Sequence, residues 1–248
     1  MSEEFVFDGL YDEMEREPIF TAIVGKQGIG KTHVALTFPN ASVADTEGRA
    51  HIVMKKFEND RRVIIGSWDD MSKMGSWFLE SQPVGSTFVV DSGSDVRHLA
   101  EIKYLEETGK TKVYPNVCWA QVDERPKNLI KALRAYGMNV VFTQRIKEKY
   151  DEEGNATGEF VPEGWNRIQY FSDVVIWLEH GIKYNDTIYF PDVLVGRVLD
   201  NKWHPIGKSK PYLINLSYDG IFEELKPEWT GTMENILKEI EQKQEEGV

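Results

Sequence analysis

Apolar and polar positions follow two different patterns along this chain, and the change falls near residue 174. Before that point, short apolar runs are separated by longer amphipathic segments. The apolar runs predict strands at 18–24, 41–44, 62–66, 86–91 and 139–143, and the amphipathic segments predict helices at 31–38, 69–80, 94–107 and 123–137. Strands that alternate with helices form mostly parallel sheets flanked by helices. We therefore expect an α/β fold.

After residue 174 the apolar runs follow one another without helical segments between them. Gly, Asn and Pro separate the predicted strands, which lie at 174–179, 186–190, 194–199 and 212–217. Residues 231–246 are acidic and place Met233, Ile236, Leu237 and Ile240 on one face of a helix. We expect an antiparallel β extension of the parallel sheet near the C-terminus. The expected division is an acidic N-terminal arm (1–17), a core (18–217) and a C-terminal part with the acidic helix (218–248).

A glycine-rich loop joins the first predicted strand to the first predicted helix. It reads Gly25-x4-Gly30-Lys31-Thr32, the P-loop pattern, in the strand–loop–helix context that this motif requires. In such a loop the backbone N–H groups point at phosphate oxygens, the lysine neutralises the β- and γ-phosphates, and the Thr hydroxyl ligates Mg²⁺. The residues predicted to hold the nucleotide are Gly25, Lys26, Gln27, Gly28, Ile29, Gly30, Lys31, Thr32 and His33. The sequence therefore predicts binding of a nucleoside triphosphate, and its context disfavours a turn that binds nothing.

An acidic residue ends another predicted strand. In Val89-Val90-Asp91-Ser92, β-forming residues carry Asp91 to the carboxyl end of the strand, where ligands gather in open α/β sheets. Together with Thr32, Asp91 is predicted to hold Mg²⁺, partly through water. The alternative is an ordinary strand-to-loop turn.

The charge balance restricts the partners. With 29 Lys and Arg against 41 Asp and Glu, the formal net charge is −12, and nucleic-acid affinity comes largely from cations that neutralise phosphates. DNA binding therefore requires a local basic patch. A single cysteine, Cys118, permits no internal disulfide. No apolar run reaches the roughly eighteen residues of a membrane span, and the acidic N-terminus lacks signal-peptide features. We expect a cytoplasmic protein, in the host cytoplasm if the gene is viral, with no membrane association.

The second predicted strand makes the pattern more specific, because Phe38-Pro39 is followed by Asp45-Thr46-Glu47-Gly48. The order of P-loop, Asp-Thr-Glu-Gly strand, Asp91-Ser92 strand and a strand ending in Gln144 resembles the ATPase core of the RecA/RadA recombinase superfamily. It is similar to the phage-encoded RecA-like AAA proteins, including the Sak-type single-strand annealing ATPases. The resemblance covers about residues 18–180 and rests on four short motifs. It implies a RecA-like P-loop NTPase fold that hydrolyses ATP with Mg²⁺ in DNA recombination, single-strand annealing or replication.

The same resemblance implies catalytic roles for Lys31, Glu47 and Gln144. Glu47 matches the carboxylate that polarises the attacking water, and Gln144, with Thr143, matches a sensor of the γ-phosphate. Other interpretations stay open. Glu47 could instead cap a helix, and Gln144 could cap its strand. Asp45, two residues before Glu47, is a rival general base or an outer ligand of the magnesium.

Two segments lie where recombinases contact DNA. Residues 145–167 combine aromatic and basic side chains with a net negative charge. The turn Asp151-Glu152-Glu153-Gly154-Asn155 also fits a hairpin between 147–150 and 158–161, so a solvated hairpin and a DNA-contacting loop are equal alternatives. Residues 108–118 are locally basic. The candidate DNA contacts are Lys110, Lys112, Arg145, Lys147, Lys149 and Arg167.

The resemblance further implies a homo-oligomer with ATP between subunits, acting on single-stranded DNA or with phage recombination or replication proteins. A neighbouring subunit would supply a cation to the site, and the candidates are Arg197, Lys202, Lys208 and Lys210. A P-loop small-molecule kinase is less favoured, because the chain has no arginine-rich lid segment. The alternative function is an ATP-binding switch or assembly ATPase that acts on protein partners without binding DNA.

Overall fold

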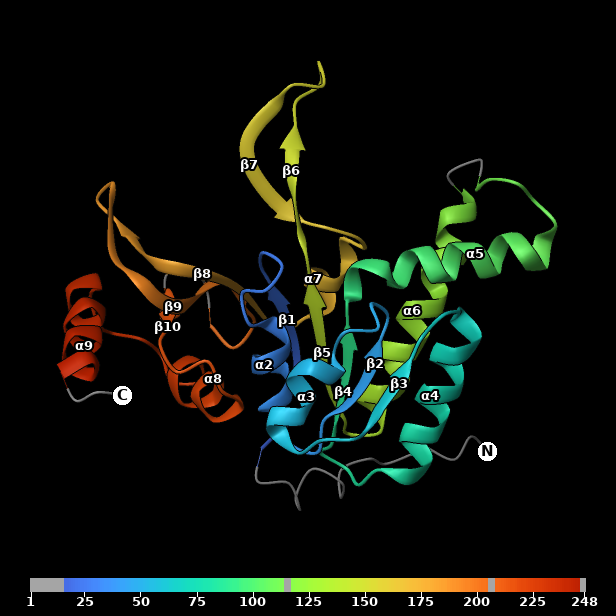
Figure 1. Ribbon diagram of the computed structural model, residues 1–248, viewed down its shortest axis with the longest axis horizontal. Helices are drawn as coiled ribbons and strands as arrows, with labels where there is room; N and C mark the ends of the chain where they lie inside the picture. The colour runs from blue at the N-terminus through green and yellow to red at the C-terminus, as the bar shows by residue number, and fades with distance from the viewer. Residues whose placement is uncertain (1–15, 114–116, 205–207, 246–248) are drawn as a thin grey trace, which may run out of the picture.

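The computed structural model describes residues 16–113, 117–204 and 208–245, and the expected N-terminal arm lies almost wholly outside them (Figure 1). The strands are β1 (Phe20–Val24), β2 (Ser42–Asp45), β3 (Arg62–Ile64), β4 (Thr87–Asp91), β5 (Asn139–Gln144), β6 (Ile146–Tyr150), β7 (Ala156–Pro162), β8 (Val174–Tyr184), β9 (Thr187–Asn201) and β10 (Tyr212–Leu213). The helices are α2 (Lys31–Leu36), α3 (His51–Met54), α4 (Trp68–Ser81), α5 (Val96–Thr108), α6 (Val117–Ala135), α7 (Arg167–Phe171), α8 (Tyr218–Leu225) and α9 (Met233–Glu245), with short 3₁₀ turns η1 (Lys55–Phe57) and η2 (Gly93–Asp95).

One mostly parallel sheet organises the chain. Eight of the described strands form this sheet, in the order β10-β9-β8-β1-β5-β4-β2-β3. Strand β1 runs parallel to both β5 and β8, and β4 runs parallel to both β5 and β2. The register places Val24 beside Gln144 and Asp45 beside Asp91. The carboxyl ends of β1, β5, β4 and β2 therefore meet at one edge of the sheet. The expected α/β fold, with helices on both faces of a parallel sheet, is confirmed.

Burial on both faces explains why the central strands read as continuous apolar runs. On one face α4, α5 and α6 contribute side chains such as Met71, Phe78 and Ile130, which pack with Phe88 of β4 and Phe142 of β5. On the other face α2, α3 and α8 cover the sheet, as Figure 1 shows. Because α8 contributes buried side chains to this second core, the packing of the sheet continues beyond residue 217.

The expected β-rich end is present, but its strands differ from the prediction. The predicted strands at 186–190 and 194–199 are one long strand, β9, which pairs antiparallel with β8. Asn185 and Asp186 connect β8 to β9 and have positive φ angles of 47° and 58°, as a tight hairpin turn requires. The predicted strand at 212–217 is reduced to the two residues of β10, and α8 follows as a helix that the strand prediction did not contain. The apolar face predicted near the C-terminus is confirmed, since Ile236 and Ile240 of α9 pack against Tyr212 of β10.

Helix α6 begins earlier than its pattern predicted. The expected start at residue 123 left Cys118 in a loop, but the helix begins at Val117 and contains Pro126 in its interior. Cys118 and Val122 lie in the core, so burial of these side chains stabilises the added turns despite the proline. The basic loop expected at 108–118 is correspondingly shorter.

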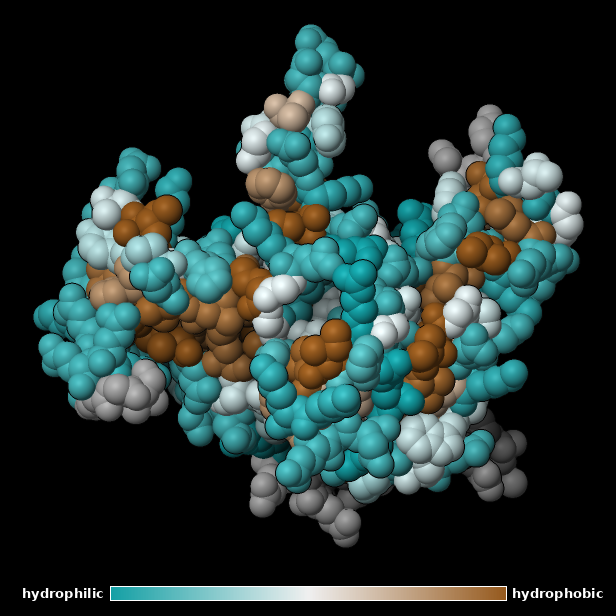
Figure 2. All heavy atoms as spheres, viewed as in Figure 1, coloured by the Kyte–Doolittle hydropathy of each residue, from teal (hydrophilic) through white to brown (hydrophobic). Residues whose placement is uncertain are grey.

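The hairpin expected between residues 147 and 161 is present as β6 and β7, which stand away from the sheet (Figure 1). The carboxylate of Asp151 accepts hydrogen bonds from the backbone N–H groups of Glu153 and Asn155 and fixes the turn. Every residue from 151 to 160 is exposed, and Figure 2 shows hydrophilic side chains over the hairpin tip. Among the described residues, no helix is both long and apolar enough to span a membrane.

We predict that Asn139 fastens the start of β5 to its neighbours. Its buried side chain accepts from the Ile19 N–H at 2.9 Å and donates to the Gly85 carbonyl at 2.6 Å. Asn139→Ala leaves two buried backbone groups without partners and should lower the free energy of unfolding by about 2–4 kcal/mol, measured by urea denaturation. The matched control is Asn166→Ala at an exposed position whose side chain makes no cap hydrogen bond. A loss no larger than that of the control would contradict the role of Asn139.

Candidate active site

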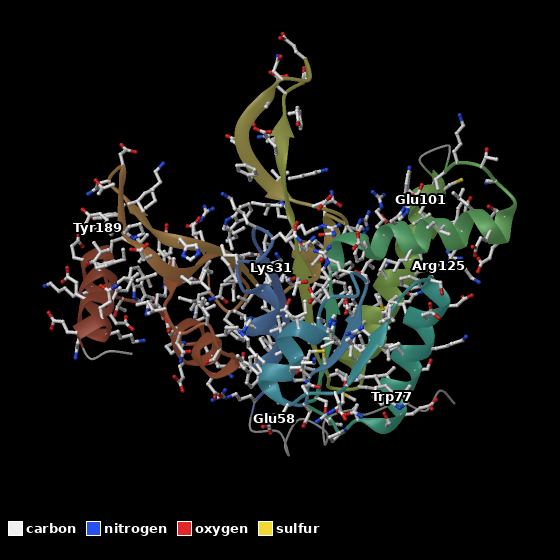
Figure 3. All side chains as sticks on the ribbon, in the orientation of Figure 1. Lys31, Glu58, Trp77, Glu101, Arg125 and Tyr189 are labelled. Carbon is white, nitrogen blue, oxygen red and sulfur yellow. The ribbon has the colours of Figure 1, made fainter. Side chains whose placement is uncertain are left out.

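The P-loop, Gly25 to Thr32, leaves the end of β1 and enters α2 (Figure 3). Gly28 and Gly30 have φ angles of 78° and 111°, which glycine adopts at little steric cost. The Gly25 N–H donates to the carbonyl of Gln144 at 3.1 Å, so the loop starts from the edge of β5. The loop backbone therefore has the curvature that a phosphate-binding loop requires.

The ammonium group of Lys31 lies inside this loop. The side chain is buried, and Nζ donates to the carbonyls of Gly25 at 3.0 Å and Lys26 at 2.8 Å. Burial lowers the pKa of Lys31, while the charges of Asp91 and Glu47 act in the opposite direction. These carboxylates favour a charged ammonium in a partly desolvated place, which suits it to bind phosphate oxygens.

Asp91 stands at the end of β4 and connects the P-loop with β5. Its Oδ2 accepts from the Thr32 hydroxyl at 2.8 Å, and its Oδ1 accepts from the Thr143 hydroxyl. The carboxylate and the Thr32 hydroxyl are oxygen donors of the kind that Mg²⁺ takes alongside water and phosphate oxygens. Across the described ranges, no cluster of three or more His, Cys, Asp or Glu side chains could hold a metal ion by itself. The donor set fits a Mg²⁺ ion that is bound together with a triphosphate.

The two acids of Asp45-Thr46-Glu47-Gly48 have different surroundings. Asp45 is fully buried, accepts from the backbone N–H groups of Glu47, Gly48 and Ala50 at 2.7–3.1 Å, and pairs with Arg62 at 3.2 Å. Its oxygens are thus occupied in shaping the loop. The side chain of Glu47 lines the cavity beside the P-loop. The geometry favours Glu47 over Asp45 as the candidate general base.

Thr46 joins the loops that follow β2 and β4. Its hydroxyl accepts from the Ser92 N–H at 2.8 Å and lies 3.1 Å from the Asp95 carboxylate. Its own N–H donates to the Asp91 carbonyl at 2.8 Å. These contacts hold Glu47 and Asp91 on the same side of the site. The motif named Thr46, but sequence reasoning gave it no role, and Asp95 was missed altogether.

Arg145 is the main difference between the expected and the observed site. Expected as a DNA contact, it lines the same cavity as Lys31 and Glu47 and pairs with Glu47 at 2.9 Å, Asp95 at 2.7 Å and Glu163 at 2.8 Å. Burial acts to lower its pKa, but hydrogen bonds with Glu163 and Asp95 outweigh burial and raise the pKa above its ordinary value. Its position immediately after a strand that ends at the ligand edge is a sequence signal that could have identified it.

Gln144, expected as a γ-phosphate sensor, is not among the described residues that line the cavity. It is buried, its Nε2 donates to the Glu163 carbonyl at 3.1 Å, and its Oε1 accepts from Gln169 at 2.7 Å. Thr143, the residue before it, contacts Asp91 directly. The structure therefore places Thr143 next to Asp91, a candidate metal ligand, and Gln144 at the base of the hairpin.

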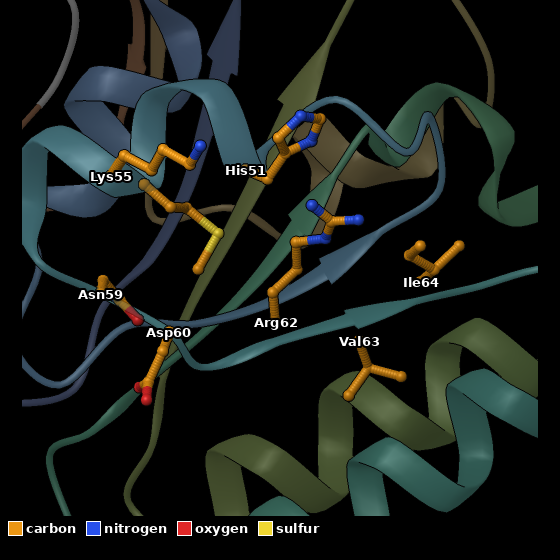
Figure 4. A pocket seen from close by; sticks show the side chains of 8 residues that line it. His51, Lys55, Asn59, Asp60, Arg62, Val63 and Ile64 are labelled. Atoms are coloured by element: carbon orange, nitrogen blue, oxygen red, sulfur yellow. The ribbon is translucent and has the colours of Figure 1, made fainter.

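A cavity of about 270 Å³ collects these groups. It is lined by Gln27, Gly28, Gly30, Lys31, Thr32, His33, Glu47, Arg49, Ala50, Ile52, Val53, Asp91 and Arg145. A larger cavity, about 580 Å³, lies by edge strand β3, where His51, Lys55 and Arg62 surround it (Figure 4). It contains no P-loop residue and neither Glu47 nor Asp91. The smaller cavity is therefore the candidate active site on chemical grounds.

Four of the remaining candidate DNA contacts lie on two projections from the sheet, and the fifth, Arg167, lies in α7. Lys147 and Lys149 are exposed on β6, and Lys149 pairs with Glu159 at 2.7 Å. Lys110 and Lys112 lie at the end of α5, where Lys110 donates to the Tyr104 hydroxyl at 2.9 Å. Arg167 lies 3.8 Å from Asp123. In Figure 1 both projections extend from the side of the sheet at which the P-loop lies.

The candidate trans-acting cations have partners within their own chain. Arg197 pairs with Glu179 at 3.1 Å, Lys208 pairs with Glu228 at 2.9 Å, and Lys202 donates to the Tyr170 carbonyl at 2.8 Å. Lys210 is buried between Glu224 and Glu239. Within the described chain, the lining of the candidate active site includes none of these four cations.

Comparison with known proteins identifies a family. No curated protein matches the chain. A family model described as an AAA domain matches residues 17–209. This range begins just before β1 and includes the P-loop, Glu47, Asp91 and Arg145, so it contains the whole candidate active site. Because the match covers more than half of the chain, the protein belongs to the AAA domain family, whose members are ATPases of the P-loop type.

Proposed function

We propose that the chain hydrolyses ATP to ADP and phosphate with Mg²⁺ as cofactor. The observation that carries this proposal is the convergence of Lys31, Thr32, Asp91 and Glu47 on one cavity at the carboxyl edge of the sheet. A phosphate-binding loop, a pair of metal-binding oxygens and a carboxylate for water activation are the parts that phosphoryl transfer to water requires.

Each of these residues has its own role in the proposed hydrolysis. The Lys31 ammonium exchanges its two loop carbonyls for β- and γ-phosphate oxygens, and Thr32 with Asp91 holds the metal. The bound Mg²⁺ supplies charge neutralisation at the phosphates. Glu47 accepts a proton from a water molecule while the water oxygen bonds to the γ-phosphorus and the bond from that phosphorus to the bridging oxygen breaks. ADP leaves with the electron pair of the broken bond.

The proposed use of this energy is DNA recombination, single-strand annealing or replication in a phage or other virus, in the cytoplasm of its host. Three observations support it. The motif order resembles that of RecA-like ATPases, and two projections carrying Lys110, Lys112, Lys147 and Lys149 extend on the side of the sheet that holds the site. Exposed Tyr150 and Phe160 on the hairpin could stack on bases of a single strand. Phage recombination or replication proteins would be its partners.

A homo-oligomer belongs to the same proposal. The candidate active site is lined by Arg145 and Lys31 from its own chain, while Arg197, Lys202, Lys208 and Lys210 lie elsewhere. A neighbouring copy that brings Lys202 or Lys208 to the site would place ATP between subunits and add charge stabilisation in the transition state. The mass of the protein in solution with and without Mg-ATP tests this part.

The alternative is an ATP-driven switch that acts on a protein partner without DNA. The observation favouring it is the acidic hairpin tip, where Asp151, Glu152 and Glu153 are all exposed. This tip repels phosphates and would suit a basic protein surface.

We predict that Lys31→Ala weakens Mg-ATP binding by about tenfold or more, because it removes charge-assisted hydrogen bonds to phosphate. Titration calorimetry with Mg-ATP measures this change. Lys73→Ala is the matched control, since Lys73 is an exposed lysine on α4 that does not line the candidate active site. Equal affinity losses in the two variants would show that Lys31 has no special role.

Glu47→Gln should keep ATP affinity and lower kcat by about 10²–10⁴-fold, the usual contribution of a general base. The matched variant is Asp45→Asn, which changes the acid that shapes the loop. It should reduce thermal stability while the folded protein keeps far more turnover than Glu47→Gln. A steady-state ATPase assay separates the two acids. Normal turnover in Glu47→Gln with loss in Asp45→Asn would assign the base to Asp45 instead.

Single-stranded DNA should stimulate the ATPase severalfold at low salt, with the effect weakening as salt rises. The double variant Lys147→Glu with Lys149→Glu should lose this stimulation and keep basal hydrolysis. The double variant Lys73→Glu with Lys131→Glu, at exposed lysines on α4 and α6 outside both projections, is the charge-matched control. Intact basal hydrolysis with no response to DNA at low salt would reject the recombination proposal and favour the protein-directed switch.

A further inference from the structure

The hairpin β6–β7 leaves the sheet beside the candidate active site through a single residue. Strand β5 ends at Gln144 and β6 begins at Ile146, so Arg145 alone connects the sheet to the hairpin. The Arg145 N–H donates to the Ser94 hydroxyl at 2.9 Å, and its carbonyl accepts from the Glu163 N–H at 2.8 Å. Both ends of the hairpin are thus fixed at Arg145.

The guanidinium group of Arg145 contacts three parts of the chain. Its nitrogens pair separately with Glu47 after β2, Asp95 in η2 and Glu163 after β7. A planar guanidinium can make several directed hydrogen bonds at once, which a lysine ammonium cannot reproduce in the same geometry. One side chain therefore joins the candidate base, the loop that follows β4 and the returning strand of the hairpin.

From this geometry we infer that Arg145 is a positioning residue that links the γ-phosphate to the hairpin. The inference rests on the proposed ATPase function. With ADP or no nucleotide, Arg145 holds Glu47 Oε1, and that oxygen is not free to accept a proton from water. A γ-phosphate in the same cavity competes with Glu47 for the guanidinium. Arg145 then turns to the phosphate and releases Glu47, while its contact with Glu163 carries the movement to the hairpin.

The local charge favours this exchange. Three carboxylates surround one guanidinium, so the cluster has a net excess of negative charge before any phosphate enters. Glu47 and Arg145 both line the cavity. An added phosphate oxygen therefore meets repulsion from Glu47 and attraction from Arg145, so the guanidinium moves toward the phosphate and the Glu47 carboxylate moves away from it. Glu163, which is outside the cavity lining, keeps its contact.

A second contact connects the hairpin with the P-loop. The Lys26 ammonium lies 5.8 Å from the centre of the Phe160 ring on β7, and the Lys26 carbonyl accepts from the Lys31 ammonium at 2.8 Å. When Lys31 turns to phosphate, this carbonyl loses a partner. The hairpin also returns to the core through Gly164, where an added Cβ would lie 2.4 Å from the Ser94 carbonyl oxygen. Because the chain is packed so closely at this point, a displacement of the site residues moves the hairpin with them.

Hydrogen exchange of the hairpin amides tests the inference. The exchange rates of residues 146–162 are compared between Mg-ADP and Mg²⁺ with the β,γ-imido analogue of ATP. In the unaltered chain the analogue should change these rates by about threefold or more relative to ADP. The reason is that amide exchange depends on how often the base of the hairpin opens locally, and this frequency differs between the two nucleotides. Glu163→Gln and Arg145→Lys should both abolish this difference, although both variants should still bind the analogue.

Glu159→Gln is the matched control, because it breaks an ion pair within the same hairpin, with Lys149, that makes no contact with the site. It should keep the full difference between ADP and the analogue. Arg145→Lys should also lower kcat by about tenfold or more with KM changed by less than about threefold, since the lost contact matters after binding. A purely structural role would instead appear as reduced stability with unchanged kcat per folded molecule.

The outcomes separate this inference from the ATPase proposal. Absence of binding of both nucleotides would reject the ATPase proposal itself. Binding and hydrolysis with identical hairpin exchange for ADP and the analogue would overturn the inference alone. A full response in Glu163→Gln would also overturn it, and this variant keeps the test decisive if Arg145→Lys does not fold.

Discussion

The site depends on the parallel pairing that brings four strand ends to one edge of the sheet. The register aligns Val24 with Gln144 and Asp45 with Asp91, so the P-loop and the two acidic strand ends begin at the same level. A shift of one residue in any of these pairings would turn each side chain to the other face. The near-complete burial of these strands on both faces makes such a shift costly, because every apolar side chain would lose its packing. The packing of the core therefore also fixes the positions of the candidate catalytic groups.

Within that edge, the use of each acid follows from its hydrogen bonds. A buried carboxylate is tolerated only when its oxygens are satisfied, and Asp45 satisfies this by accepting three backbone N–H groups and pairing with Arg62. Those contacts make it a structural acid. Glu47, two residues later, lies at the cavity and is held by a side chain that can move. The same short motif thus contains one acid that fixes the loop and another that is available for chemistry.

Much of the fold could be predicted from the sequence, because the buried parallel strands and the P-loop are local patterns with strong physical requirements. The prediction of two separate strands at 186–190 and 194–199 was wrong for a clear reason. Pro191 and the polar residues around it look like a break, yet β9 continues past them beside β8 with an irregular register. The start of α6 was missed because burial of Cys118 and Val122 outweighs the local preference set by Pro126.

The residues of the candidate site also fall into those that the sequence could predict and those that it could not. Lys31 and Thr32 belong to the P-loop motif and Asp91 ends an apolar strand, and each of these local patterns predicts its own chemistry. Arg145 has no motif, and its three carboxylate partners come from positions 47, 95 and 163. Only the folded chain brings these segments together, so the sequence offered a basic residue beside a hairpin and suggested DNA contact. Contacts between distant segments need the tertiary structure, and here they involve the residue that joins the hairpin to the site.

The surroundings of Arg145 show where part of the chain's excess of acidic residues is used, which composition alone does not show. Three carboxylates within reach of one guanidinium are not the arrangement that maximises stability, since the acids repel one another and a single cation cannot neutralise them all. Replacing Glu163 or Asp95 with a neutral residue would reduce that repulsion. An excess of acids around one cation does, however, leave the cation with competing partners of similar strength. A guanidinium that is shared in this way can change partners at modest cost when a phosphate enters, whereas one in a closed two-charge pair would have to abandon its only counter-ion. The arrangement therefore exchanges some stability for a contact that can respond to the ligand.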